Sequence, residues 1–100
     1  MYYMSTRNTE LKLKSAEAIK KGLSDDGGLF VPSEFSTVST AEIKKMVNMN
    51  YIDRAKLVLK KFLTDFTAAE ISKCVEGAYG KGFDSDKVAP VVKLADDKYI

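Results

Sequence analysis

Hydrophobic residues recur at helical spacing through the middle of the chain, and this pattern predicts most of its structure. In the segment YIDRAKLVLKKFL, Ile52, Ala55, Leu59 and Phe62 follow one another three or four positions apart, and three lysines and an arginine lie at other positions of the segment. An apolar stripe at this period is typical of an amphipathic helix that packs one face on a core. We therefore expect a helix beginning near Tyr51.

A second helix is predicted directly after it. Thr67 and Glu70 have the spacing of a capping box, in which each side chain accepts a hydrogen bond from the other residue's backbone N–H. Ile71, Cys74 and Val75 then line one stripe. Because Cys74 lies on this apolar stripe and the chain has no histidine to activate it, we expect a buried structural thiol.

Two shorter helices are predicted nearer the N-terminus. Ser15 is the expected N-cap of the segment AEAIKK, and Gly22 followed by Leu23 has the sequence of a Schellman ending. Ser39 or Thr40 is the expected cap of a further short helix with an apolar face.

Short apolar runs predict a few strands. They lie at the N-terminus around Tyr2 and Tyr3, in the run LFV before Pro32, and on both sides of Asp96-Asp97. Together the patterns predict an α+β fold, mostly helical, with about four helices and a few short strands in one domain over residues 1–100. The final strand has barely begun at Ile100, so we expect a truncated strand and a longer parent protein.

Composition narrows the classes of function. The 100 residues include one cysteine and no histidine, which excludes internal disulfides, histidine general bases and histidine-ligated metals. No run is long and apolar enough for a membrane span, and no secretory signal is recognisable, so we expect a cytoplasmic protein without a membrane partner. The net charge is only +2, and the lysine pairs fall opposite the apolar stripes as solvated charge, so we expect no nucleic-acid partner.

The stretch LSDDGGLFVP contains two carboxylates beside two glycines. A calcium loop needs more oxygen ligands spread over about 12 residues, and a phosphate loop needs glycines that lead into a helix. Here the glycines lead into a predicted strand. We therefore interpret Asp25, Asp26, Gly27 and Gly28 as a structural turn, in which glycine adopts positive φ at low steric cost.

Ser5, Thr6 and Arg7 form a second candidate site. Two hydroxyls and a guanidinium in consecutive loop positions have the chemistry to bind a carboxylate or a phosphate. Judged on these residues alone, an ordinary polar strand end is the favoured interpretation, because short runs of hydroxyl residues and arginine are common in loops.

The order of three segments, MYYMSTR, SAEAIKKGLSDDGGLFVP and APVVKLADDKYI, resembles the N-terminal region of the threonine synthase family. The resemblance covers essentially the whole chain, and its most specific part is the segment from Leu23 to Pro32. The family pattern has glycine after Ser-Thr-Arg, and here that position is Asn8, a residue that tolerates positive φ.

The resemblance implies a fold type II pyridoxal-phosphate enzyme that converts O-phospho-L-homoserine and water to L-threonine and phosphate. It also implies that the lysine forming the Schiff base is not in this chain, so the chain by itself is expected to hold no catalytic or cofactor-binding residue and to be inactive. Its expected partners are the remaining domains of the same polypeptide, beside whose active site Ser5, Thr6 and Arg7 are expected to lie near the substrate.

Two other interpretations remain open. The chain would otherwise be a stand-alone helical interaction module, or a domain that binds pyridoxal phosphate by itself. Apolar surface that other domains normally cover would favour self-association of the isolated chain.

Overall fold

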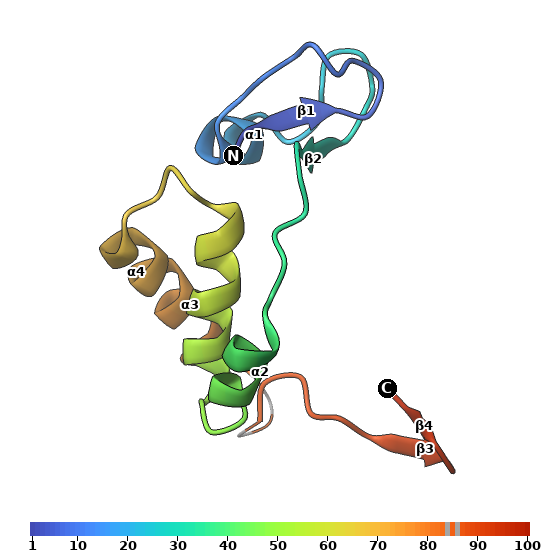
Figure 1. The fold of residues 1–100 in the computed structure, drawn as a ribbon, viewed down its shortest axis with the longest axis vertical. Helices are drawn as coiled ribbons and strands as arrows, with labels where there is room; N and C mark the ends of the chain where they lie inside the picture. Colours follow the sequence, from blue (N-terminus) through green and yellow to red (C-terminus); the bar gives the residue numbers. More distant parts are fainter. Residues whose placement is uncertain (84, 86) are drawn as a thin grey trace.

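The predicted mixture of helices and short strands is confirmed. The computed structural model describes residues 1–83, 85 and 87–100. In chain order the elements are β1 (Tyr3–Ser5), α1 (Ser15–Lys21), β2 (Phe30–Pro32), α2 (Thr40–Met46), α3 (Tyr51–Phe62), α4 (Ala68–Tyr79), β3 (Lys93–Ala95) and β4 (Lys98–Tyr99). Figure 1 shows β1, α1 and β2 together, a long connection to the three remaining helices, and the β3–β4 pair extending away from them. In the described part of the chain, no helix is long and apolar enough to cross a membrane.

Strands β1 and β2 form a two-stranded antiparallel sheet in which Tyr3 lies opposite Pro32 and Ser5 lies opposite Phe30. The backbone N–H and C=O of Tyr3 bond instead to Leu13, at 2.8 and 2.9 Å. Because Tyr3 directs its polar groups away from Pro32, the missing N–H of proline costs no ladder bond there. Proline therefore fits inside β2, although the sequence pattern placed it just after the strand.

The predicted N-cap of α1 is wrong by one residue. Lys14 holds the capping position, and Ser15 is the first helical residue and is buried. The Ser15 side chain bonds to the carboxylate of Asp65, in the connection between α3 and α4. Local spacing identified a residue with capping chemistry, but its partner comes from a distant segment.

The ending of α1 also differs from the prediction. Gly22 has the positive φ expected there, 78°. However, Leu23 donates its N–H to the carbonyl of Lys21, two residues back, at 3.1 Å, which is the hydrogen bond of a γ-turn and not of a Schellman motif. Leu23 remains 62% exposed. Its side chain is therefore free of the apolar contact that a Schellman ending would give it.

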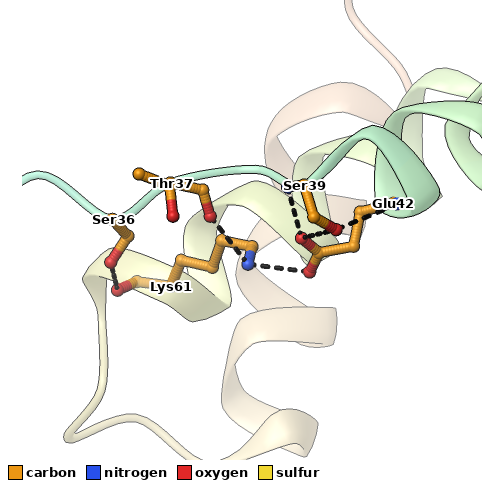
Figure 2. A network of polar contacts seen from close by, with 5 residues as sticks. All are labelled: Ser36, Thr37, Ser39, Glu42 and Lys61. Carbon is orange, nitrogen blue, oxygen red and sulfur yellow. Dashed lines mark hydrogen bonds and ion pairs between the residues drawn. The ribbon is translucent and has the colours of Figure 1, made fainter.

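A polar network fixes α2 and the preceding connection against α3 (Figure 2). Ser39 caps α2 as predicted, and its hydroxyl and backbone N–H both bond to the Glu42 carboxylate. Lys61, on α3, forms an ion pair with Glu42 at 2.7 Å and donates to the carbonyl of Thr37 at 3.2 Å. The Ser36 hydroxyl in turn donates to the carbonyl of Lys61 at 3.0 Å. The expectation that Lys61 is merely solvated charge is therefore wrong.

Helices α3 and α4 lie side by side (Figure 1), and an ion pair of 2.6 Å between Lys56 and Glu76 links them. The capping box of α4 is confirmed: Glu70 donates its N–H to the Thr67 hydroxyl, and its carboxylate accepts from Thr67. Ile71 and Val75 on α4 are buried.

The predicted burial of Cys74 is wrong, because the thiol is exposed. Helix α4 packs mainly on α3, so only a narrow stripe of α4 is covered. At 100° per residue, Cys74 is about 100° around the helix from Val75. The thiol therefore falls outside the covered stripe.

The two strands predicted on either side of Asp96 and Asp97 are present as β3 and β4, and they pair as an antiparallel hairpin. Lys93 lies opposite Tyr99, and Ala95 opposite Lys98. Asp97 adopts φ 59°, a left-handed conformation that aspartate tolerates better than most residues. Every residue of both strands is exposed.

Candidate functional site

The structure brings together the two candidate sites of the sequence, the Ser-Thr-Arg segment and the Asp-Asp-Gly-Gly turn. Ser5 ends β1 and is fully buried. Its hydroxyl donates to the Asp26 carboxylate at 2.8 Å and accepts the backbone N–H of Arg7 at 3.1 Å. Thr6 bonds to Leu29 twice: the Thr6 hydroxyl accepts the Leu29 N–H at 3.0 Å, and the Thr6 N–H donates to the Leu29 carbonyl at 2.9 Å. The Ser-Thr-Arg segment thus lies directly on the Asp-Gly-Gly turn.

The turn itself is closed by backbone hydrogen bonds. Ser24 donates its N–H to the Gly28 carbonyl at 3.1 Å, and Gly27 donates to the Ser24 carbonyl at 2.9 Å. Gly27 has φ 76°, where a residue with a side chain would be strained. Asp26 also accepts the N–H of Gly28, at 2.8 Å, so its carboxylate joins the turn to β1.

Gly28 allows the closest approach in the site. A Cβ placed on Gly28 would lie 2.1 Å from the Ser5 hydroxyl and 2.9 Å from the Asp26 carboxylate. A Cβ at this position would overlap the Ser5 hydroxyl, so residue 28 has to be glycine. The second glycine of the motif is therefore required by packing, and the first by backbone conformation.

Hydrogen bonds stabilise the ionised form of Asp26. Chiefly the N–H of Gly28, and then the Ser5 hydroxyl, hold the pKa of this carboxyl below its usual value. Asp25 points elsewhere and forms an exposed ion pair with Lys21 at 2.6 Å. Of the two adjacent carboxylates, only that of Asp26 accepts hydrogen bonds from the turn and from β1, whereas that of Asp25 lies on the surface.

Arg7 is the member of the triplet with unused binding capacity. It is exposed, and its Nη1 donates to the backbone carbonyl of Asp26 at 3.1 Å. A guanidinium has five N–H donors, so most of this group remains able to bind an anion. Ser5 and Thr6, in contrast, use their hydroxyls to hold the segment in place.

Asn8 continues the segment as a turn of ordinary backbone conformation. Its N–H donates to the Ser5 carbonyl at 3.2 Å, and its side-chain oxygen accepts the Glu10 N–H at 3.0 Å. Among the described residues other than glycine, positive φ occurs at Ala89 and Asp97. The backbone at Asn8 therefore does not need the conformational freedom of glycine.

The turn does not have the chemistry of a cofactor or metal site. The space beside Gly28 is filled by the hydroxyl of Ser5 and the carboxylate of Asp26, and a carboxylate there would repel the phosphate of pyridoxal phosphate. Within the described part of the chain, no group of three or more acidic, histidine or cysteine side chains is placed to hold a metal ion. The residues of this site thus do not fit either group.

The sequence profile described as "Threonine synthase N terminus" matches residues 2–79. The chain belongs to this family.

Individual threonine synthase relatives agree with this assignment. Threonine synthase-like 1 from Pongo abelii is 38% identical over 98% of this chain, and threonine synthase from Methylobacillus glycogenes is 32% identical over 100% of it. A crystal structure of pyridoxal-phosphate-bound threonine synthase from Brucella melitensis superimposes with a TM-score of 0.86 at 32% identity and covers 100% of the chain. The chain spans only 15–23% of the length of these proteins.

Asp65 is the residue that sequence reasoning missed. It accepts the backbone N–H groups of Ser15 and Ala16, both at 3.1 Å, and so caps α1 from the other part of the molecule. The Tyr3 hydroxyl adds a second link nearby, to the carbonyl of Phe62 at 3.3 Å. Nothing in the local pattern around Asp65 marks this role, because its partners are about fifty residues away.

Proposed function

We propose that this chain acts as the N-terminal region of a threonine synthase, an enzyme that converts O-phospho-L-homoserine and water to L-threonine and phosphate. The single observation that supports this best is the superposition of the entire chain on a pyridoxal-phosphate-bound threonine synthase at a TM-score of 0.86. The remaining domains of the polypeptide would be its partners, and the cytoplasm its compartment. In that enzyme pyridoxal phosphate supplies the electron sink for the reaction.

The chain alone is expected to be inactive and to hold no cofactor. The turn that contains both adjacent glycines is occupied by its own Ser5 and Asp26 side chains. Such a site has neither the space nor the charge for a phosphate group. Mixing the isolated chain with pyridoxal phosphate should therefore leave the absorbance of the free cofactor unchanged.

Arg7, held by Ser5 and Thr6, would lie near the substrate entrance of the complete enzyme. Support comes from the site geometry: Ser5 and Thr6 fix the backbone on either side of the β1 end, and Arg7 is exposed with donors to spare. O-phosphohomoserine carries both a carboxylate and a phosphate, the two anions that a guanidinium binds in bidentate fashion.

A chimeric enzyme tests the assignment. This chain replaces the matching N-terminal residues of the Brucella melitensis threonine synthase, and phosphate release from O-phosphohomoserine is measured. We expect an active chimera. An inactive but soluble and cofactor-loaded chimera would contradict the proposal and would favour a stand-alone interaction module.

Substitution in the same chimera tests the role of Arg7. Arg7→Ala should lower kcat/KM for O-phosphohomoserine about ten-fold, because a hydrogen bond to a charged group is lost. Lys73→Ala removes a different exposed cation, on α4, and should leave the kinetics unchanged. Unaltered steady-state kinetics of the Arg7 variant would contradict the role of Arg7 without touching the family assignment.

A further inference from the structure

The guanidinium of Arg7 lies against the turn that contains Asp26 and Gly27. A Cβ placed on Gly27 would lie 3.1 Å from the Arg7 Nη1 and 3.7 Å from its Cζ. The guanidinium therefore packs on the glycine, in space that a side chain at residue 27 would crowd. The Arg7 Nη1 also donates to the carbonyl of Asp26 at 3.1 Å, so this nitrogen is fixed on the turn.

The same aspartate holds the backbone of Arg7. The Asp26 carboxylate accepts the Ser5 hydroxyl at 2.8 Å, and that hydroxyl accepts the Arg7 N–H at 3.1 Å. Ser5 is fully buried, so water competes little for these bonds. Asp26 thus acts on Arg7 at two points, on the backbone through Ser5 and on the guanidinium through its own carbonyl.

The carboxylate of Asp26 fixes the position of that carbonyl. It accepts the N–H of Gly28, two residues on, at 2.8 Å, which closes an Asx turn. The pKa of Asp26 is lowered chiefly by this N–H, then by the Ser5 hydroxyl, and least by the charge of Arg7. Within the part of the chain that the structure describes, Arg7 forms no ion pair. The carboxylate therefore acts on the turn, and the charge of Arg7 has no close counter-ion there.

The contacts leave one edge of the guanidinium open. Its Nη1 bonds to Asp26, whereas no hydrogen bond joins the Nε or Nη2 of Arg7 to another described residue. These two nitrogens can form parallel hydrogen bonds to a carboxylate or a phosphate. Because Arg7 is exposed, an anion can reach them from solvent.

We propose that Asp26 is a positioning residue, which holds the Arg7 guanidinium so that its Nε and Nη2 bind an anionic group of the substrate. A mobile arginine loses much of its rotamer freedom when it binds a ligand, and one that is already held loses less. Preorganisation by Asp26 thereby favours binding. This inference rests on the proposed function, because it takes O-phosphohomoserine as the source of the anion.

Nuclear magnetic resonance of the arginine side chains tests the positioning without relying on activity. The chain has two arginines, Arg7 and Arg54, so its nitrogen–proton correlation spectrum contains two Nε–H signals. Arg54 is the matched control, because it bonds to the carbonyls of Met46 and Val47, at 2.7 and 3.0 Å, and not to the turn.

The heteronuclear Overhauser effect at Nε reports motion on the picosecond to nanosecond timescale. It should be positive and similar for both arginines in the unsubstituted chain. In Asp26→Ala it should fall at least about two-fold for Arg7 and stay unchanged for Arg54. A value for Arg7 that does not depend on Asp26 would overturn the proposal.

A double-mutant cycle in the chimera with the Brucella melitensis enzyme tests the consequence for binding. Asp26→Ala should lower kcat/KM for O-phosphohomoserine about three- to ten-fold, because a mobile Arg7 binds less well. In the Arg7→Ala background, Asp26→Ala should change kcat/KM less than about two-fold, because no guanidinium remains to be positioned. A full loss in that background would show an effect independent of Arg7 and would overturn the proposal.

Asp25→Ala is the control for the cycle. It removes the neighbouring carboxylate, which forms an exposed ion pair with Lys21, and it should leave the kinetics unchanged. Asp26→Asn keeps an oxygen that can accept both bonds of the carboxylate and should restore kcat/KM to within about two-fold of the unsubstituted chimera. A loss as large as that of Asp26→Ala would contradict positioning by these hydrogen bonds.

Ser5→Ala is the second variant if Asp26→Ala does not fold. It removes the hydroxyl between Asp26 and the Arg7 N–H and leaves the bond from Gly28 to Asp26 in place. It should lower kcat/KM about two- to five-fold, and less than about two-fold when Arg7 is already alanine. Equal losses in the two backgrounds would overturn the proposal.

The outcomes separate this inference from the proposed function. An active chimera in which the mobility of Arg7 does not depend on Asp26 rejects the positioning role and retains the function. A soluble, inactive chimera, together with an Arg7 that Asp26→Ala releases, rejects the function and retains the positioning role.

Discussion

The carboxylate of Asp65 lies against the first turn of α1, where it accepts hydrogen bonds from the backbone N–H and the hydroxyl of Ser15, fifty residues earlier. One side chain thereby caps a helix and joins the N-terminal sheet and α1 to the α3–α4 pair. Asp65→Ala should lower the free energy of unfolding by about 1–2 kcal/mol, the usual effect of losing a cap. Urea denaturation followed by circular dichroism measures this change, and Asp53→Ala, in the first turn of α3, should cost less than about 0.5 kcal/mol.

The same carboxylate makes stability depend on pH. Partial desolvation, the largest single effect, raises the pKa of Asp65, but the hydrogen bonds from Ser15 and Ala16 together outweigh it and leave the pKa lowered. A lowered pKa contributes stability above the unfolded value, about 3.9, that is lost as pH falls through the folded pKa. The loss of stability between pH 5 and pH 2 should therefore be smaller in Asp65→Ala than in the unsubstituted chain. Identical acid profiles would show that Asp65 does not form this cap in solution.

Gly28 should not tolerate alanine. Its Cβ would lie 2.1 Å from the Ser5 hydroxyl, so the turn or β1 must shift, at a cost of about 1–3 kcal/mol. Gly77, on α4, is the matched control, because a Cβ there meets no atom within 4 Å. Gly77→Ala should stabilise the chain by about 0.5–1 kcal/mol through helix propensity. Thermal unfolding of both variants measures the two effects, and a stable Gly28→Ala variant would refute the close approach.

Glu42 should titrate near pH 2. The ion pair with Lys61, followed by the hydrogen bonds from Ser39, lowers the pKa of Glu42 to about 2. Because that pKa is lowered, the stability this group contributes is present above the unfolded glutamate value and disappears as pH falls through about 2. Lys61→Met should raise the pKa of Glu42, measured by NMR titration of the side-chain carboxyl. Glu70 is bonded by Thr67 without that lysine and should keep its lowered pKa; an unmoved pKa of Glu42 would contradict the pairing in Figure 2.

Cys74 should react as an exposed thiol. The native chain is expected to be labelled by a thiol reagent at a rate close to that of a small free thiol, with no denaturant added. A labelling rate that rises with urea concentration would mean that the thiol reacts only after unfolding. That result would contradict the exposure of Cys74 and support the buried thiol that the sequence pattern predicted.

Exposed apolar side chains should make the isolated chain associate with itself. Phe35, Val91 and Ile100 are each at least 75% exposed, and apolar surface of this kind drives association when no partner covers it. Size-exclusion chromatography with light scattering should show an average mass that rises with concentration. A concentration-independent monomer would reject this expectation.

The sequence by itself determined the elements that depend on neighbouring residues. Helices α3 and α4 follow from apolar residues three or four positions apart, and the N-cap at Ser39 and the capping box at Thr67 involve residues three positions apart. The positive φ at Gly22 and Gly27 was also predictable, because glycine at a helix end or in a turn adopts this conformation without steric cost. Each of these features is formed within one turn of chain, so the pattern of residue types was sufficient to predict it.

Only the tertiary structure decided which distant groups meet. Ser5 donates to Asp26 across 21 residues, and Ser15 bonds to Asp65 across 50, so the path of the chain, and not its local pattern, creates these contacts. The exposure of Cys74 and the pairing of Lys61 have the same origin, because packing decides which part of a helix is covered. Periodicity gives a helix its faces, and the neighbouring elements determine which face is buried.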